Sequence, residues 1–317
     1  MFRSRWPAVA TVVTLLAWGT AFVAIRAALP DFSVAGLTLA RLLVASLALA
    51  LVTPLLPVRL PARSDLPRIA VCAATGIVGY QLLLNAGQRT VPAGTASLLV
   101  NTGPLFAALL AWLLLREQMR RDMWLGLALG LAGATTMALS HGEGLRPSAD
   151  ALLILGAAFF LASLSVIQKP LLARRTGFEV TCYATWSGTL LSLPLAPALV
   201  EDLGAAHARS LLAVFYLGVV ASAVGYVAWA YAVARVSVAT AANALYLVPL
   251  VAICTGWWVL GEKPELVALV GGALAIAGVV VSRRRPPPSA AATTTTATTQ
   301  ARRPRTRTPR IEEPTHA

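Results

Sequence analysis

The chain has 317 residues, of which 57% are hydrophobic and only 12% are charged, and its mean hydropathy is +0.73. A soluble domain carries about 25% charged residues to cover its surface, so this composition excludes an ordinary soluble protein and predicts an integral membrane protein. The formal net charge of +13 does not indicate nucleic-acid binding, because the basic residues punctuate long uncharged runs instead of gathering in one segment.

Ten mostly apolar segments follow one another along the chain, each close to the roughly 20 residues with which a helix crosses the hydrocarbon core. Strands of a membrane barrel would alternate apolar and polar residues at every second position, and these segments do not. We therefore predict an all-α fold with ten transmembrane helices. The predicted spans are 7–28, 33–56, 66–87, 93–115, 122–140, 149–169, 178–200, 208–232, 238–260 and 264–282.

The distribution of Lys and Arg predicts the orientation of these spans. With the N-terminus in the cytoplasm, fifteen Lys and Arg up to Arg285 fall on the inner side. Only five fall on the outer side, as the positive-inside rule requires. Both termini are thus predicted to be cytoplasmic. Richness in Ala, Arg and Leu suggests a GC-rich bacterial genome and hence the bacterial plasma (inner) membrane, with the chain crossing it many times.

Residues 283–317 differ from the rest of the chain, because they are basic, rich in Pro and Thr, and without apolar periodicity. Such a segment buries too little apolar surface to offset the entropy of ordering it. We predict a disordered cytoplasmic tail. It either fixes the topology by its charge or holds anionic lipid headgroups, and no nucleic-acid partner is expected.

The second half of the chain repeats the first. Thr95, Pro104 and Glu117 recur 145 residues later as Thr240, Pro249 and Glu262. Each half holds five spans, an odd number, so the second half enters the membrane upside down relative to the first. We predict one five-helix repeat at 1–140 and an inverted one at 141–282, an architecture that recurs in transporters working by alternating access.

Three stretches together resemble a known family. They are Leu16-Ala-Trp-Gly-Thr-Ala-Phe22, the run from Ala96 to Pro104 that leads to Arg116-Glu117, and its echo from Ala241 through Pro249 to Leu260-Gly-Glu262. They are similar to the EamA-type transporters of the drug/metabolite transporter superfamily, a resemblance that covers residues 7–282. It implies ten helices around a central cavity, with the fifth and tenth helices peripheral. It also implies transport of amino acids, nucleotide precursors or other metabolites, often outward.

Pro104 and Pro249 are expected near mid-bilayer, because each is the twelfth residue of its predicted span. A proline inside a helix removes one hydrogen bond and clashes with the carbonyl four residues earlier. Matched interruptions in the two halves of a transporter point to the substrate site, so both prolines are predicted helix breaks or hinges beside a cavity. The alternative is a kink that serves packing alone.

Polar and aromatic side chains near these prolines predict a cavity for a small polar or amphipathic molecule. Each of them alone also fits an ordinary contact between helices. Arg41, a charge inside a span, either binds an anionic substrate group or donates to carbonyls freed by the prolines. The candidate substrate-binding residues are Trp18, Thr20, Arg41, Gln81, Asn85, Asn101, Tyr226, Trp229, Asn243 and Tyr246.

The best-supported function is thus a secondary transporter that exports a small metabolite such as an amino acid. A membrane enzyme, a channel and a scaffold remain alternatives. The chain has no catalytic motif of the common hydrolase, protease or nucleotide-binding types, and its three cysteines lie in different spans. We therefore expect no catalysis, metal or cofactor. Glycines on 122–140 and 264–282 predict close helix packing and a homodimer surface.

Overall fold

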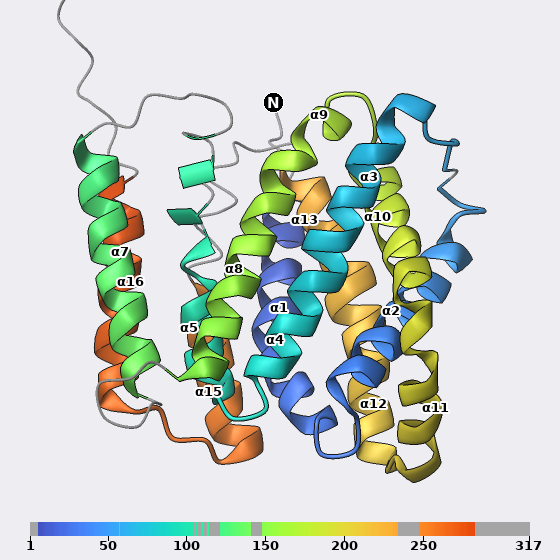
Figure 1. Cartoon of the computed structure of the whole chain (residues 1–317). Coiled ribbons are helices and arrows are strands. Elements are labelled where there is room, and N and C mark those ends of the chain that lie inside the picture. Colours follow the sequence, from blue (N-terminus) through green and yellow to red (C-terminus); the bar gives the residue numbers. More distant parts are fainter. Residues whose placement is uncertain are drawn as a thin grey trace, which may run out of the picture. The chain divides into compact units, whose positions relative to one another are not determined.

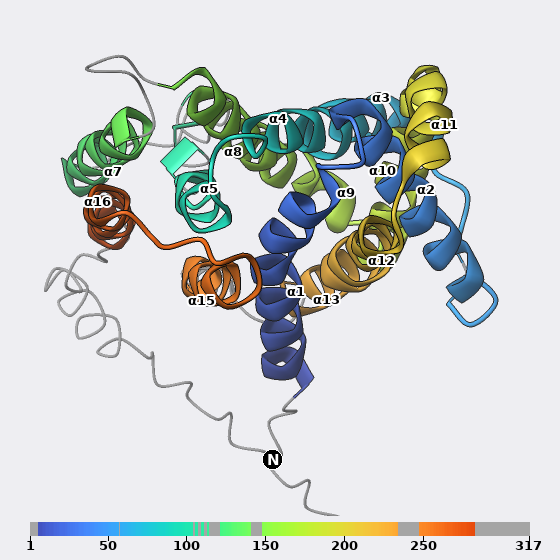
Figure 2. The same cartoon turned by 90° about the horizontal axis from the view of Figure 1, so that it is seen from below.

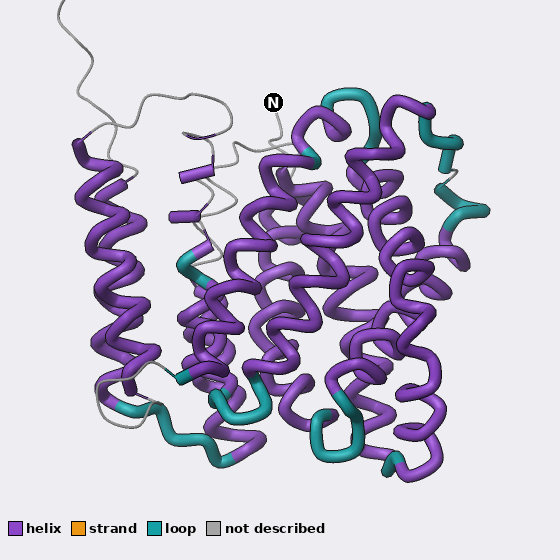
Figure 3. Tube along the Cα trace, in the orientation of Figure 1, coloured by secondary structure: helices purple, strands orange, loops and turns teal. Residues whose placement is uncertain are grey.

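The computed structural model describes residues 6–56, 58–103, 105–106, 109–110, 113, 121–140, 148–233 and 247–282. All regular secondary structure in these residues is helical, as the apolar segments predict (Figures 1 and 3). The predicted tail, Pro104, Asn243 and Tyr246 lie outside the described residues.

Helices of three kinds, α, 3₁₀ and π, follow one another along the described chain. The α-helices are α1 (Trp6–Ala28), α2 (Val34–Val52), α3 (Leu66–Cys72), α4 (Tyr80–Gly87), α5 (Ala93–Val100), α7 (Arg121–Ser140), α8 (Ala149–Ile167), α9 (Lys169–Leu172), α10 (Gly177–Ser192), α11 (Ala196–Ala205), α12 (Ala208–Tyr216), α13 (Gly225–Val233), α15 (Val248–Leu260) and α16 (Leu266–Ser282). Between them lie the short 3₁₀ turns η1 (Arg63–Asp65) and η3 (Leu193–Leu195) and the π-helical segments η2 (Ala73–Gly79) and η4 (Leu217–Val224).

Four helices of the described chain are long and apolar enough to cross a membrane. Two of them belong to α1 and α2. The other two are composite: Arg63–Gly87 runs through α3, η2 and α4, and Ala208–Ala232 runs through α12, η4 and α13. Each composite helix has 25 residues and contains a π-helical segment, a rare element in which the backbone winds more widely.

Prolines explain where the helices depart from the predicted spans. The single helix predicted at 178–200 is divided, because α10 ends at Ser192 and α11 begins at Ala196. Pro194 and Pro197 lie in the first turns of η3 and α11, where their missing N–H groups cost no helical hydrogen bond. The prediction of one uninterrupted span there is wrong.

Of the two prolines predicted at mid-helix, the structure describes only Pro249. Helix α5 ends at Val100 and the chain turns at Asn101 and Thr102, shortly before Pro104, which lies outside the described residues. Pro249 instead lies in the first turn of α15, where no hydrogen bond is lost. Residues 238–246 of the predicted span lie outside the described residues, so the expectation that Pro249 interrupts a helix interior stays a prediction.

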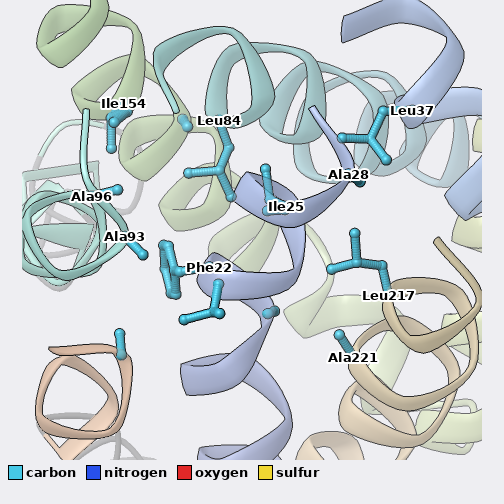
Figure 4. Close-up of a cluster of buried hydrophobic side chains, with 14 of the residues drawn as sticks. Phe22, Ile25, Ala28, Leu37, Leu84, Ala93, Ala96, Ile154, Leu217 and Ala221 are labelled. Atoms are coloured by element: carbon cyan, nitrogen blue, oxygen red, sulfur yellow. The ribbon is translucent and has the colours of Figure 1, made fainter. Parts of the chain in front are cut away.

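Helix α1 lies at the centre of the bundle and packs against α5, α12, α13 and α15 (Figure 2). The largest core cluster surrounds it, with Phe22 and Ile25 of α1 facing Leu84 of α4 and Ala93 of α5 (Figure 4). Elsewhere large apolar side chains point outward: Trp258 is 88% exposed and Leu51 is 80% exposed. Such an apolar exterior around a helical bundle is suited to lipid.

Helices α7 and α16 form a pair at one edge of this bundle (Figures 1 and 2). A Cβ atom on Gly133 would lie 2.4 Å from the carbonyl oxygen of Gly271, and a Cβ on Gly278 would lie 2.4 Å from that of Gly126. The backbones therefore touch, as small residues on membrane helices allow. The predicted glycine packing thus occurs within the chain, and the homodimer stays a prediction.

Candidate functional site

An aromatic cluster joins α1 to α13. The ring of Trp18 lies 5.3 Å from that of Tyr226 and 5.6 Å from that of Trp229, measured between ring centroids. The Trp18 indole N–H donates to the carbonyl of Ala221 in η4 at 3.1 Å, which fixes the indole on the π segment. Three predicted substrate-binding residues, one from α1 and two from α13, therefore form a continuous aromatic surface, termed the aromatic wall.

This wall borders a small pocket of about 50 Å³ between α1, α8, α10 and α13. Gln168 and Thr181 add polar groups to its otherwise apolar lining. A cavity of this size holds a few water molecules at most, so the pocket is too small in this conformation for an amino acid.

Helix α4 carries a row of buried amides along one face. Gln81, Asn85 and Gln88 are all fully buried. The Asn85 amide donates to the Thr38 hydroxyl at 3.0 Å and the Gln88 amide donates to the Phe22 carbonyl at 3.1 Å. Both polar atoms of Gln81, Asn85 Oδ1 and Gln88 Oε1 have no hydrogen-bond partner among the described residues.

Unpaired buried amides are costly in a protein interior. They are consistent with a path that admits water or a polar ligand in another conformation. The sequence prediction included Gln81 and Asn85 but missed Gln88, although its spacing of seven residues from Gln81 places it on the same helix face.

Arg41 of α2 is 3% exposed, and its Nε donates to the hydroxyl of Ser222 in η4 at 2.8 Å. Tyr80 and Tyr226 lie near its guanidinium. No bond between Arg41 and a carbonyl freed by a proline is found among the described residues. Ser222 and Tyr80 were not predicted, because each acts through a partner on a different helix.

The remaining predicted residues are placed differently. Thr20 is hydrogen-bonded to the hydroxyl of Tyr216 and to the backbone of its own helix, so it joins α1 to α12. Asn101 is half-buried at the C-terminal cap of α5. The structure therefore brings together Trp18, Tyr226, Trp229 and Arg41, with Gln81 and Asn85 on the neighbouring helix α4.

Turns of the described chain lie at the two ends of the bundle (Figure 1). We term the lower end in Figure 1 the α1–α2 end, because the connection between α1 and α2 lies there. At this end Arg26 Nε lies 3.0 Å from Glu262 Oε1, while the other carboxylate oxygen accepts from the Ala93 N–H at 2.7 Å. Arg26 also donates to the carbonyls of Gln88 and Arg89. We term this network the Arg26–Glu262 latch.

A second tie at the α1–α2 end joins Asp31 to the start of α12. The Asp31 carboxylate accepts from the His207 backbone N–H at 2.9 Å. The Ser210 hydroxyl and this N–H hold the pKa of Asp31 at about 2, below its ordinary 3.8. Together with the latch, this tie connects helices that are far apart in the sequence at the α1–α2 end of the bundle.

No group of three metal-binding side chains occurs in the described part of the chain. An all-helical bundle with membrane-length apolar helices, an apolar exterior and buried polar groups inside defines a multi-pass membrane protein. A sequence profile of the EamA-like transporter family matches residues 5–139 and again residues 149–284. The chain belongs to this family.

Individual relatives agree with the family assignment. The chain is 49% identical, over 88% of its length and 93% of the relative's, to the "Probable terminal-alkyne amino-acid exporter" of Streptantibioticus cattleyicolor. It is 35% identical to an uncharacterised transporter of Bacillus subtilis, covering 83% of this chain and 86% of that one. It is 27% identical to the "Probable amino-acid metabolite efflux pump" of Salmonella typhimurium, covering 88% and 95% of the two chains.

A solved crystal structure has a similar fold, with a TM-score of 0.60 at 19% sequence identity. The similarity covers 87% of this chain and 96% of that one, and at this identity it supports the fold alone.

Proposed function

We propose that this protein is a secondary transporter of the bacterial plasma membrane that exports an amino acid or a similar small metabolite. In this proposal ten transmembrane helices form two inverted five-helix repeats, both termini are cytoplasmic, and the substrate binds at the interface of the repeats. The observation that carries the proposal is the set of buried, unpaired polar groups beside an aromatic wall inside a membrane bundle.

The contacts between α7 and α16 support the inverted repeat. Gly133 meets Gly271 while Gly278 meets Gly126, and the 145-residue offset relates Gly133 to Gly278 and Gly126 to Gly271. Residue numbers rise along one helix as they fall along the other, so the helices are antiparallel. A two-fold axis that exchanges antiparallel helices is perpendicular to them, and for membrane helices it lies in the membrane plane.

Two further features repeat with the same offset. The composite helices begin at Arg63 and Ala208 and end at Gly87 and Ala232, each pair 145 residues apart. The π segments also match, since η2 ends at Gly79 and η4 ends at Val224. The family profile matches once in each half. Each feature supports a duplication that preserved local backbone geometry as well as sequence.

The conformation supports alternating access. The α1–α2 end, which the positive-inside rule assigns to the outer side, is closed by the Arg26–Glu262 latch and the Asp31–His207 tie. The pocket beside Trp18 extends toward Gln168 and Ala230, near the ends of α8 and α13 that face the cytoplasm in this topology. We therefore assign this conformation to a state closed to the outside.

Two relatives are named as exporters or efflux pumps for amino acids or their metabolites, which supports an amino-acid substrate for this chain. The test is counterflow in proteoliposomes preloaded with unlabelled L-propargylglycine, L-leucine or L-threonine, with uridine and glucose as unrelated compounds. We expect uptake of at least one labelled amino acid and none of uridine or glucose. Counterflow of only uridine or glucose, or of no compound by correctly folded protein, contradicts the proposal.

The same assay locates the site with two tryptophan variants. Trp229→Ala removes part of the pocket wall, whereas Trp258→Ala changes a side chain that is 88% exposed on the apolar exterior. An aromatic contact contributes about 1 kcal/mol beyond its buried area, so we expect Trp229→Ala to reduce counterflow at least roughly fivefold. Trp258→Ala serves as the matched control and should keep wild-type activity.

A further inference from the structure

Arg41 is a buried cation that has no acidic partner among the described residues. Its side chain is 3% exposed, its Nε is bound to the uncharged hydroxyl of Ser222, and its Nη1 has no hydrogen-bond partner. The ion pairs of the described chain all lie near the bundle ends, and none includes Arg41. Charges inside membrane helices are costly and normally pair with one another or mark a substrate path.

The surroundings of Arg41 connect it to the substrate pocket. Tyr226 lies near the guanidinium and also lines the pocket beside Trp18 and Trp229. Ser222, which holds Nε, lies one helical turn before Tyr226 on the same composite helix. Arg41 does not itself line the pocket in this conformation, and Ser222 and Tyr226 of the composite helix connect it to the pocket wall.

The contact that encloses Arg41 is formed by a π segment. Helix α2 approaches η4 so closely that a Cβ on Gly218 would lie 3.0 Å from the Arg41 carbonyl oxygen. Irregular turns of this kind are frequent at functional sites.

We propose that Arg41 binds the carboxylate of the transported molecule and so selects substrates that carry one. This inference rests on the proposed function and specifies its substrate class: α-amino acids with a free carboxylate, whose ammonium or side chain lies against the aromatic wall. A guanidinium presents a planar fork of N–H donors that matches the two oxygens of a carboxylate. Trp18 and Trp229 offer aromatic faces suited to a cation or an apolar side chain.

The first test uses the unaltered protein and a series of ligands that differ only in the carboxyl group. Proteoliposome counterflow is measured for L-leucine, for its carboxamide L-leucinamide and for the decarboxylated amine 3-methylbutylamine, and likewise for L-propargylglycine and its carboxamide. A charge-assisted hydrogen bond accounts for roughly a 10- to 100-fold change in affinity. We expect the acids to be transported and the carboxamide and amine to be reduced by at least that factor.

The second test alters the guanidinium. In Arg41→Gln, transport and ligand-induced thermal stabilisation by the acids should fall roughly 10- to 100-fold, whereas weak transport of the carboxamide should not fall. Arg41→Lys keeps the charge but loses the fork, so it should retain part of the acid transport and serves as the control if Arg41→Gln does not fold.

The outcomes separate the two proposals. Equal transport of an acid and its carboxamide by the wild-type protein overturns the carboxylate inference and leaves the exporter function intact. Unchanged acid transport by folded Arg41→Gln overturns it as well. Failure to transport any amino acid, with the protein folded, overturns both proposals.

Discussion

We predict that breaking the Arg26–Glu262 latch makes the α1–α2 end open more often. In Glu262→Gln the Arg26 guanidinium loses its carboxylate partner, and a single amide oxygen cannot accept fully from both Arg26 and the Ala93 N–H. The two side chains are 27% and 16% exposed, so solvent screens the pair only in part. We assign the lost charge-assisted contact about 1–2 kcal/mol, which corresponds to a roughly 5- to 30-fold larger population open at this end.

The assay measures access to Val91, a fully buried residue between the latch residues Gln88 and Ala93. The native cysteines Cys72, Cys182 and Cys254 are replaced, Val91→Cys is introduced, and a membrane-impermeant maleimide is added to the outside of right-side-out vesicles. Glu262→Gln and Arg26→Gln should each accelerate labelling roughly 5- to 30-fold, and the double variant should add little more.

The matched control is Glu201→Gln, which neutralises an exposed acidic residue on α11 near the α1–α2 end. It should leave the labelling rate unchanged. If Glu262→Gln labels no faster than the parent, the latch does not hold this end closed. If the effects of Arg26→Gln and Glu262→Gln are fully additive, the two residues do not act as a pair.

Three further predictions concern stability and the site. Gly133→Ala and Gly278→Ala should each lower the melting temperature of the detergent-solubilised protein by a similar amount, because both place a Cβ 2.4 Å from a backbone oxygen. Gly204→Ala is the control and should leave the melting temperature unchanged, since its Cβ would have no atom within 4 Å. Gln81→Leu should abolish amino-acid counterflow and raise thermal stability by about 1 kcal/mol, since it removes a buried amide with no partner; lowered stability would refute this account. The pKa of Asp31 is lower in the folded than in the unfolded protein. The stability that its carboxylate contributes is therefore complete above pH 3.8 and is lost as the pH falls toward about 2. Asp31→Asn should therefore remove that part of the acid-induced fall in melting temperature, and an unchanged pH profile would exclude the tie as its cause.

Hydropathy alone predicted much of the fold. Helices α1, α7 and α8 begin and end close to their predicted spans, because the cost of an unpaired backbone in lipid makes a long apolar run helical. The division of α10 from α11 was missed, since the run around Pro194 is as apolar as a continuous span. The π segments were missed for a similar reason: their residues have the same hydropathy as an α-helix, and only tertiary packing selects the wider winding.

The site was harder to predict than the fold. Arg41, Gln81 and Asn85 were identified because polar residues inside apolar spans are rare. Ser222 and Tyr80 gave no such signal, since a serine or tyrosine in a membrane helix is common and acquires its role only from Arg41 on another helix. Likewise, nothing in the sequence around Glu262 indicates that its carboxylate joins Arg26 to the start of α5, because the partners are far apart along the chain.

In the proposed inverted-repeat architecture, the two halves share a scaffold and differ in their polar groups. Glycines at the α7–α16 contact and the π segments recur with the 145-residue offset. In contrast, Gln81 corresponds to Tyr226 and Asn85 to Ala230, while Leu161 occupies the position equivalent to Trp18. An amino acid has no two-fold symmetry, so a site on the axis between two repeats cannot contact it with identical residues from both. Symmetry is useful for exchanging two conformations of the scaffold, whereas recognition requires that the residues around the substrate differ. If the symmetric scaffold exchanges conformations and the differing residues recognise the substrate, polar groups should be distributed unequally over a repeated framework, as they are here.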